Sequence, residues 1–137
     1  MGEIGVFVKS LTVFNRRVLI IRRSNYTIRG KGEWDIPGGG MQIGETILEC
    51  LHREVKEETG LAIRDEKLVY AMTLLVSPTD QVIGLTYISH ADSDKVILSH
   101  EHTNYIWATM AQLKERLTKA TLDDYERHSV FDVLDID

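Results

Sequence analysis

Three glutamates, Glu54, Glu57 and Glu58, are spaced so that a helix would carry their carboxylates on one side. Each residue of an α-helix advances about 100° around the axis, so the three side chains share an arc of roughly 100°. Carboxylates four residues apart on a helix, such as Glu54 and Glu58, repel each other, and a bound cation would offset this repulsion. Mg²⁺ and Mn²⁺ prefer oxygen ligands, and Mg²⁺ commonly bridges carboxylates to substrate phosphates. The spacing favours a divalent-metal site; a solvated acidic face is the alternative.

The helix that would position these carboxylates is predicted from Glu45 to Thr59, and Gly60 is placed to end it in a left-handed cap. Its predicted buried face consists of four aliphatic residues: Ile47, Leu48, Leu51 and Val55. The helix is thus predicted to have a core side, an outer side and an acidic side.

The surrounding segment reads GGGMQIGETILECLHREVKEETGL from Gly38 to Leu61. It resembles the signature of the Nudix hydrolases, G-x5-E-x7-R-E-U-x-E-E-x-G-U, in which U is a bulky aliphatic residue. Every specified position matches, from Gly39 and Glu45 through Arg53 to Leu61. At average residue usage, a chance match has a probability on the order of 10⁻⁷ or less. A W-x-x-P-G-G run from Trp34 to Gly39 extends the resemblance.

The resemblance implies roles for individual residues. It places metal binding on the carboxylates of Glu54, Glu57 and Glu58 and on the Gly38 carbonyl. A further acidic ligand is expected before a tryptophan-containing strand, where Glu101 precedes Trp107. The general base stays open among Glu54, Glu57 and Glu101.

Arg53 is implied to pair with Glu45 and to hold the helix and the preceding loop in register. The alternative is an exposed pair with Glu49 one helical turn away. The signature glycine, Gly39, is expected to lie against the substrate, because glycine lets a backbone approach a ligand closely.

Further substrate-binding candidates flank the glycine-rich segment. Guanidinium groups bind phosphates through two hydrogen bonds, which makes candidates of the basic residues Arg22, Arg23, Arg29 and Lys31. Aromatic rings can stack on a base, which makes candidates of Trp34, Tyr26 and Phe7, with a core role preferred for Phe7. Cys50 is expected to be a small buried residue, and His100 and His102 to lie at the surface or behind the metal ligands.

The remaining pattern predicts a sheet with helices packed on its faces, an α/β (α+β) chain of the Nudix fold with a mixed sheet sandwiched between α-helices. Strands are predicted at Ile4–Phe14, Arg17–Arg23, Lys67–Val76, Gln81–Ala91 and Thr103–Thr109. A long loop from Ser24 to Gly44 is expected to contain a short strand around Trp34 to Ile36. Helices are predicted at Met110–Leu117 and from Thr121, as N-cap, to about Leu134.

Length and composition set the remaining expectations. The chain has 137 residues, which favours a single domain over residues 1–137. A net charge of −5 without a basic stripe disfavours polymeric nucleic acid, and no apolar run approaches a membrane span. One cysteine and no evident signal peptide favour the cytoplasm. A monomer or a homodimer is expected.

The function implied by the resemblance is hydrolysis of the pyrophosphate bond in a nucleoside diphosphate linked to another group, with Mg²⁺ or Mn²⁺ as cofactor. A MutT-like nucleoside triphosphate pyrophosphohydrolase is favoured, with 8-oxo-dGTP as a candidate substrate. The alternatives are hydrolysis of ADP-ribose, a dinucleoside polyphosphate or a nucleotide sugar, and a nucleotide-sensing Nudix module without turnover. The G-x4-G-K-[ST] segment of P-loop NTPases is missing.

Overall fold

The computed structural model describes residues 2–25 and 30–137, and one mixed sheet organises them. Its main path runs β3 (Trp34–Asp35), β2 (Arg17–Arg23), β1 (Ile4–Phe14), β6 (Gln81–Ala91) and β5 (Ile63–Leu75). Off this path, β4 (Gly38–Gly40) pairs with β1 and β7 (His102–Ala108) pairs with β2. The β1–β6 pair is parallel and the others are antiparallel.

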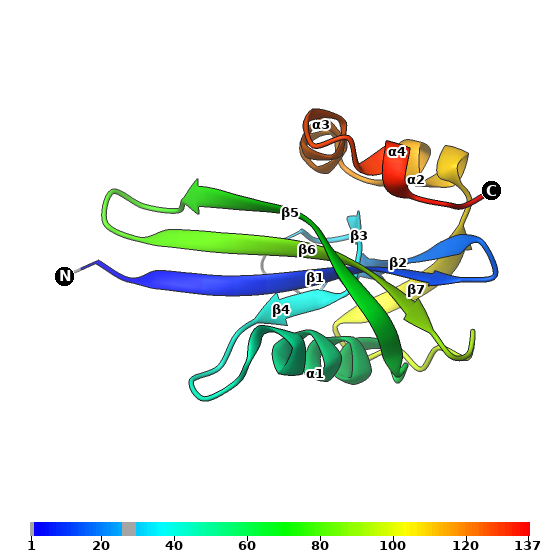
Figure 1. Cartoon of the computed structure of the whole chain (residues 1–137), viewed down its shortest axis with the longest axis horizontal. Helices are drawn as coiled ribbons and strands as arrows, with labels where there is room; N and C mark the ends of the chain where they lie inside the picture. Colours follow the sequence, from blue (N-terminus) through cyan, green and yellow to red (C-terminus); the bar gives the residue numbers. More distant parts are fainter. Residues whose placement is uncertain (1, 26–29) are drawn as a thin grey trace.

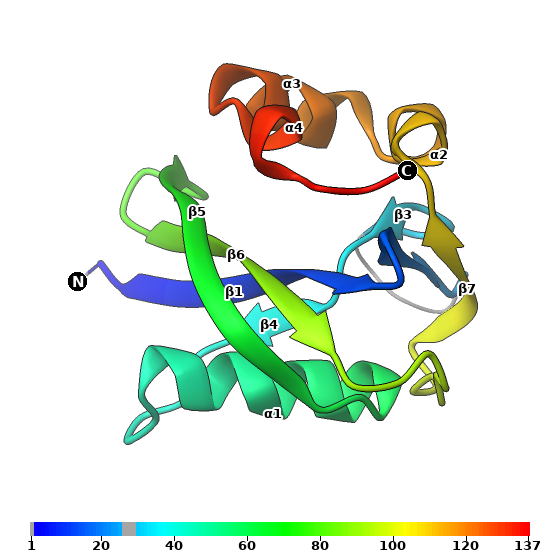
Figure 2. The same cartoon turned by 45° about the vertical axis from the view of Figure 1, so that its right-hand side comes forward.

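Helices cover both faces of the sheet. Figures 1 and 2 show α1 (Ile47–Thr59) beneath it and three shorter helices above it. These are α2 (Met110–Arg116), α3 (Lys119–Arg127) and α4 (Val130–Val133). The predicted α/β (α+β) class, with a mixed sheet between helices, is confirmed.

Strand β2 shows why this layering forms. Val18 and Ile20 belong to the hydrophobic cluster under α2, α3 and α4, whereas Leu19 and Ile21 belong to the cluster against α1. All four side chains are fully buried. A strand covered on both faces needs an unbroken apolar run, because successive side chains point to opposite faces. Burying each such side chain stabilises the fold by about 1.5–3 kcal/mol.

Several predicted boundaries were wrong. Helix α1 begins at Ile47, because Thr46 caps it, and β5 begins at Ile63 instead of Lys67. Strand β4 was not predicted. The predicted C-terminal helix is two helices, capped by Thr118 rather than Thr121, with Ser129 in the left-handed region at φ 56° between them.

The predicted core face of α1 was also partly wrong. Leu51 and Val55 are fully buried, but Ile47 and Leu48 are 37% and 43% exposed. Cys50 is buried in their place, which confirms the prediction for that residue. No helix in residues 2–25 and 30–137 has the length and apolar character needed to cross a bilayer.

Candidate metal and pyrophosphate site

Helix α1 carries the predicted acidic residues, and both of its ends are fixed by local hydrogen bonds. The Thr46 side chain accepts from the Glu49 backbone N–H, and the Glu49 carboxylate accepts from the Thr46 N–H. These two reciprocal hydrogen bonds satisfy backbone N–H groups at the start of the helix that have no partner within the helix itself. Gly60 ends the helix at φ 73°, a conformation that costs glycine little. The orientation of the acidic side is therefore set from both ends.

Glu54 lies directly against the glycine strand β4. A Cβ atom added to Gly39 would stand 2.3 Å from Glu54 Oε2 and 2.7 Å from Oε1. Only glycine leaves this space for the carboxylate. Gly39 of the strand and Glu54 of the helix thus lie against each other, although they are 15 positions apart in the sequence.

Glu58 is the most enclosed carboxylate of the site. Its side chain is 12% exposed, and its Oε1 accepts a 2.8 Å hydrogen bond from the Gly38 N–H. Burial is the main cause that raises the pKa of Glu58 from 4.5 to about 7; the nearby carboxylates of Glu54 and Glu101 also raise it, whereas the Gly38 hydrogen bond lowers it. Glu58 is therefore repelled both by Glu54, one turn away on α1, and by Glu101, which is distant in the sequence.

Arg53 links the loop before α1 to the acidic side of the helix. Its Nε and Nη2 donate to both carboxylate oxygens of Glu45, at 2.6 and 2.9 Å. Its Nη2 also donates to the Gly40 carbonyl at 3.0 Å, and its Nη1 donates to Glu54 Oε1 at 2.7 Å. The pairing of Arg53 with Glu45 is observed, whereas Glu49 is engaged in the helix cap.

Glu57 occupies the outer part of the acidic side. Its side chain is 60% exposed, and its Oε2 lies 3.3 Å from Arg53 Nη1. The same guanidinium nitrogen therefore contacts Glu54 and Glu57 together. Arg53 thus brings a single positive charge to two of the three carboxylates on the acidic side of the helix.

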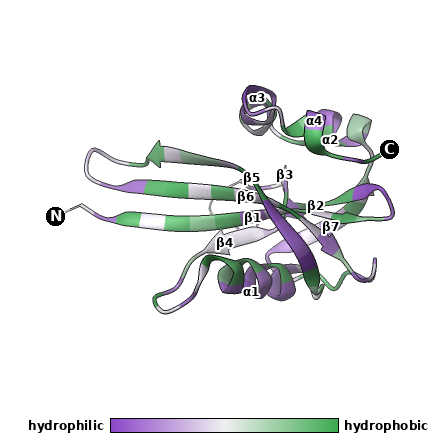
Figure 3. Ribbon diagram, in the orientation of Figure 1, coloured by the Kyte–Doolittle hydropathy of each residue, from purple (hydrophilic) through white to green (hydrophobic). Residues whose placement is uncertain are grey.

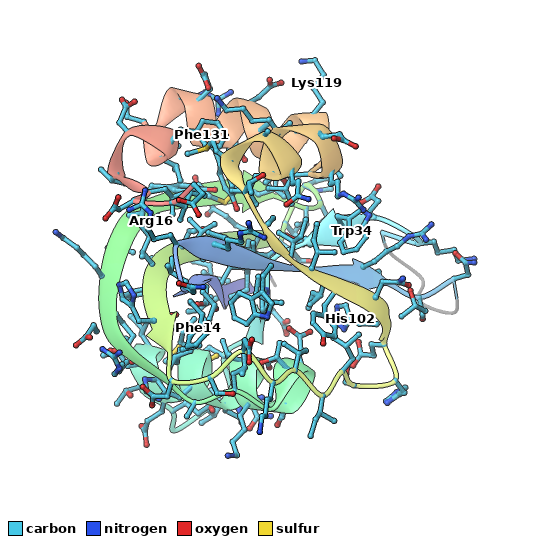
Figure 4. All side chains as sticks on the ribbon, turned by 90° about the vertical axis from the view of Figure 1, so that its right-hand side faces the viewer. Phe14, Arg16, Trp34, His102, Lys119 and Phe131 are labelled. Atoms are coloured by element: carbon cyan, nitrogen blue, oxygen red, sulfur yellow. The ribbon has the colours of Figure 1, made fainter. Side chains whose placement is uncertain are left out.

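The far side of the site is formed by the start of β7 and the end of β2. His102 Nε2 lies 4.0 Å from Glu58 Oε2, and burial lowers the pKa of His102, as does the charge of Arg23. Figure 4 shows His102 in the half of the molecule that contains α1. The positive charge of Arg23 acts on Glu58 and His102, so Arg23 lies at the edge of the acidic group.

A divalent ion fits the donors of this site but would change their contacts. In the described part of the chain, no three His, Cys, Asp or Glu side chains already form a metal-binding group. Arg53 holds the carboxylates of Glu54 and Glu57, and the Gly38 N–H holds Glu58. Oxygen donors that repel one another beside a backbone glycine suit Mg²⁺ or Mn²⁺. Binding would replace the contact between Arg53 and Glu54.

The other predicted substrate-binding residues lie in different surroundings. Arg22 Nε donates to the Gly32 carbonyl at 3.0 Å. Trp34 packs against the cluster under α2, and the Arg116 guanidinium lies 5.2 Å from its ring centre. Figure 4 shows Trp34 on the helix α2 side of the sheet. Tyr26 and Arg29 lie outside the described residues.

Sequence reasoning missed a polar hollow on the opposite face of β1. Its volume is about 100 Å³, and its lining includes an ion pair between Lys9 and Asp35. Lys9 is the register partner of Gly38, whose N–H donates to Glu58. Lys9 and Asp35 match no specified position of a sequence motif, and only the folded sheet brings their side chains together.

Comparison with known proteins adds independent findings. The NUDIX domain family model matches residues 4–129. The chain is 48% identical over 52 residues to an 8-oxo-dGDP phosphatase of Homo sapiens, covering 38% of this chain and 16% of that protein. It is 38% identical over 86 residues to an ADP-ribose pyrophosphatase of Methanocaldococcus jannaschii, covering 61% and 49%. The chain thus spans less than half of each of these relatives.

A solved structure resembles the whole fold. The MutT protein from Methanosarcina mazei Go1 superposes with a TM-score of 0.77 and 26% sequence identity, covering 95% of this chain and 96% of that one. The similarity thus extends over nearly the whole of both chains.

Proposed function

The chain belongs to the NUDIX family, and we propose that it is a hydrolase that cleaves the pyrophosphate bond of a nucleoside diphosphate linked to a further group. The observation that carries this proposal is the meeting of Glu54 and Glu58 at the glycine strand, with Glu101 and Arg23 close by. Relatives named as pyrophosphatase and phosphatase support it.

A bound divalent ion, Mg²⁺ or Mn²⁺, would polarise the phosphate and organise the attacking water. The residues that would hold it are Glu54, Glu57 and Glu58, with the Gly38 carbonyl and Glu101 as further ligands. These donors come from α1, β4 and the segment before β7, so they would surround an ion from several directions.

The chain's own residues contribute positioning and charge. Arg53 and Glu45 hold the loop before α1 against the helix, which fixes Gly39 and Gly40 beside Glu54. Arg23, whose charge acts on Glu58, would supply a guanidinium group to a phosphate oxygen of the substrate. One of the carboxylates would accept the proton of the attacking water, with Glu54, Glu57 and Glu101 as the candidates.

Within this class, we favour a MutT-like nucleoside triphosphate pyrophosphohydrolase that forms a nucleoside monophosphate and pyrophosphate, with 8-oxo-dGTP as a candidate. The similarity to the MutT structure over nearly the whole chain supports this choice. The second candidate is an ADP-ribose pyrophosphatase, supported by the archaeal relative with that name.

Product analysis tests both candidates. The protein is incubated with Mg²⁺ or Mn²⁺ and with nucleoside triphosphates, 8-oxo-dGTP, ADP-ribose, a dinucleoside polyphosphate or a nucleotide sugar. Metal-dependent release of a nucleoside monophosphate and pyrophosphate from a triphosphate is the expected result. Preferential cleavage of ADP-ribose would favour the second candidate. If no substrate were cleaved while nucleotides still bound, the protein would instead be a sensing module.

A further inference from the structure

A hollow of about 340 Å³ lies between β5, β6 and the junction of α3 with α4, and we call it the junction hollow. Figure 2 shows α3 and α4 on the side of the sheet opposite α1. The polar residues that line the hollow are Asp65 and Lys67 on β5, His90 on β6, and His128 and Ser129 at the junction. None of the proposed metal ligands is among its described lining residues. Small-molecule sites have volumes of roughly 300–1,000 Å³, so the junction hollow has room for a small ligand.

Strand pairing brings two basic residues to the same side of the sheet. Lys67 is the register partner of Ile88, and His90 follows Ile88 by two positions on β6. Alternate residues of a strand point to the same face, so Lys67, Ile88 and His90 share one face. Ile88 packs against the hydrophobic cluster under α2, α3 and α4. Lys67 and His90 therefore lie on the face that these helices cover.

His128 is held on the other side of the junction hollow by an aromatic contact. Its ring stacks on the ring of Tyr70, with the ring centres 4.5 Å apart and the planes at 8° to each other. A stacked imidazole keeps its two nitrogens at the edge of the ring, where they can form hydrogen bonds. Ser129 follows at φ 56° in the N-cap position of α4, but its side chain makes no capping hydrogen bond. The junction therefore presents an imidazole and a hydroxyl group to a ligand.

The basic groups of the junction hollow lack partners, whereas its carboxylate has one. In the part of the chain that the structure describes, the side chains of Lys67 and His90 form no hydrogen bond or ion pair, and that of His128 makes only its ring contact. Asp65 Oδ2 lies 2.5 Å from Arg64 Nη1, so the charge of this carboxylate is offset. The hollow thus has an uncompensated positive charge on a protein whose net charge is −5.

From these observations we propose that the junction hollow binds the phosphate group of a small molecule, at a site separate from the acidic site on α1. The Lys67 ammonium supplies the positive charge. His90 and His128 donate hydrogen bonds to phosphate oxygens from two sides, and the Ser129 hydroxyl is a further donor. This assignment goes beyond the proposed hydrolase activity and does not depend on it.

The surroundings leave room for an organic group attached to the phosphate. A neighbouring hollow of about 450 Å³ shares Ile88, His90 and Val133 with the junction hollow. Val133 is 58% exposed, so a ligand that covered it would remove apolar surface from water. The carboxylates that line the neighbouring hollow are those of Asp92 and Asp135, and each of them contacts an arginine. An anionic ligand can therefore extend in this direction without meeting an unpaired carboxylate.

Nuclear magnetic resonance of the metal-free protein tests the proposal, because the carboxylates of the acidic site repel phosphate when no divalent ion is bound. Ribose 5-phosphate, inorganic phosphate and ribose are titrated separately at constant pH, and the histidine ring signals are followed. Ribose 5-phosphate should shift the signals of His90 and His128 in a saturable manner, whereas ribose should not. Inorganic phosphate that binds at least as tightly would identify phosphate itself as the ligand, and weaker binding would identify an organic phosphate.

Two variants separate the proposed contacts from the packing of the hollow. Lys67→Met should weaken the binding of ribose 5-phosphate by about tenfold or more, because it removes the ammonium and keeps a long side chain. His128→Phe should also weaken binding, because phenylalanine can keep the ring stack on Tyr70 but has no ring nitrogen. Lys95→Met is the matched control, since Lys95 is exposed and is not among the described residues that line either hollow. Circular dichroism checks that each variant is folded.

Three results would overturn the phosphate site. They are the absence of saturable shifts at His90 and His128, an unchanged affinity in folded Lys67→Met, and shifts confined to His102, which would place the ligand at the acidic site. The titration contains no divalent ion and measures no turnover. Its result therefore stands apart from the success or failure of the proposed hydrolase activity.

Discussion

The guanidinium of Arg53 forms a bidentate ion pair with the carboxylate of Glu45, in which Nε lies 2.6 Å from Oε2 and Nη2 lies 2.9 Å from Oε1. Because the same guanidinium also contacts Glu54, Glu57 and the Gly40 carbonyl, it connects the loop, the helix and the glycine strand. Through this connection, a side chain that need not touch the substrate can control the geometry of the proposed metal ligands.

Arg53→Lys should lower kcat/KM by about tenfold to a hundredfold, because a lysine ammonium cannot bind both carboxylate oxygens of Glu45 and also contact Glu54. Hydrogen exchange at the backbone amides of residues 40–46 should become faster. Arg64→Lys is the control, since Arg64 makes exposed pairs with Asp65 and Asp92. Normal exchange and normal turnover in Arg53→Lys would contradict the positioning role.

Gly39→Ala should reduce turnover by about a hundredfold in a folded protein, because the new methyl group would displace the carboxylate of Glu54. Mn²⁺ binding, followed by electron paramagnetic resonance, should weaken in parallel. Gly40→Ala is closely matched, since a Cβ at Gly40 meets nothing within 4 Å. Equal Mn²⁺ affinities in the two variants would show that the contact between Gly39 and Glu54 is unimportant.

Glu57→Gln should lower the metal-dependent turnover by about 10²–10³-fold while the midpoint of thermal unfolding stays close to that of the wild type. The side chain is 60% exposed, so its replacement disturbs little packing. Glu126→Gln, an exposed change on α3, provides the comparison. Rates near those of the wild type in Glu57→Gln would remove Glu57 from the chemistry.

The Glu45 pair predicts a specific dependence of stability on pH. The hydrogen bonds from Arg53 are the main cause that lowers the pKa of Glu45 from 4.5 to about 2. A carboxyl group with a lowered pKa in the folded state stabilises that state above its unfolded pKa, and this contribution is lost as pH falls toward about 2. The free energy of unfolding, measured with urea, should therefore differ between the wild type and Glu45→Gln by a constant amount from pH 8 to 5. This difference in the free energy of unfolding should shrink between pH 4.5 and 2.5. A difference that stays the same over the whole pH range would contradict a stabilising ion pair between Arg53 and Glu45.

The sequence predicted those parts of the fold whose signals are local. The bounds of β1, β2 and β6 agree with the predictions, since alternation and apolar runs mark them directly. Strand β4 was missed because three glycines have no strand propensity, and only pairing with β1 makes them a strand. Figure 3 shows long hydrophobic stretches in the strands but little such signal in β4.

The candidate site shows the same division between local and distant information. The helical spacing of Glu54, Glu57 and Glu58 and the pairing of Arg53 with Glu45 followed from the signature. The proximity of Glu58 to His102 and Arg23 depends on pairing between β2 and β7, which no short motif encodes. Lys9 and Asp35 were missed for the same reason.

The most direct test of this account is a crystal structure with Mn²⁺ and a non-hydrolysable nucleotide, in which anomalous scattering locates the metal. We predict that Glu54 leaves Arg53 and, with Glu58, binds Mn²⁺ beside Gly38 and a phosphate oxygen of the nucleotide. Mn²⁺ bound elsewhere, with Glu54 still held by Arg53 and Glu58 still held by the Gly38 N–H, would contradict the assignment of this acidic site.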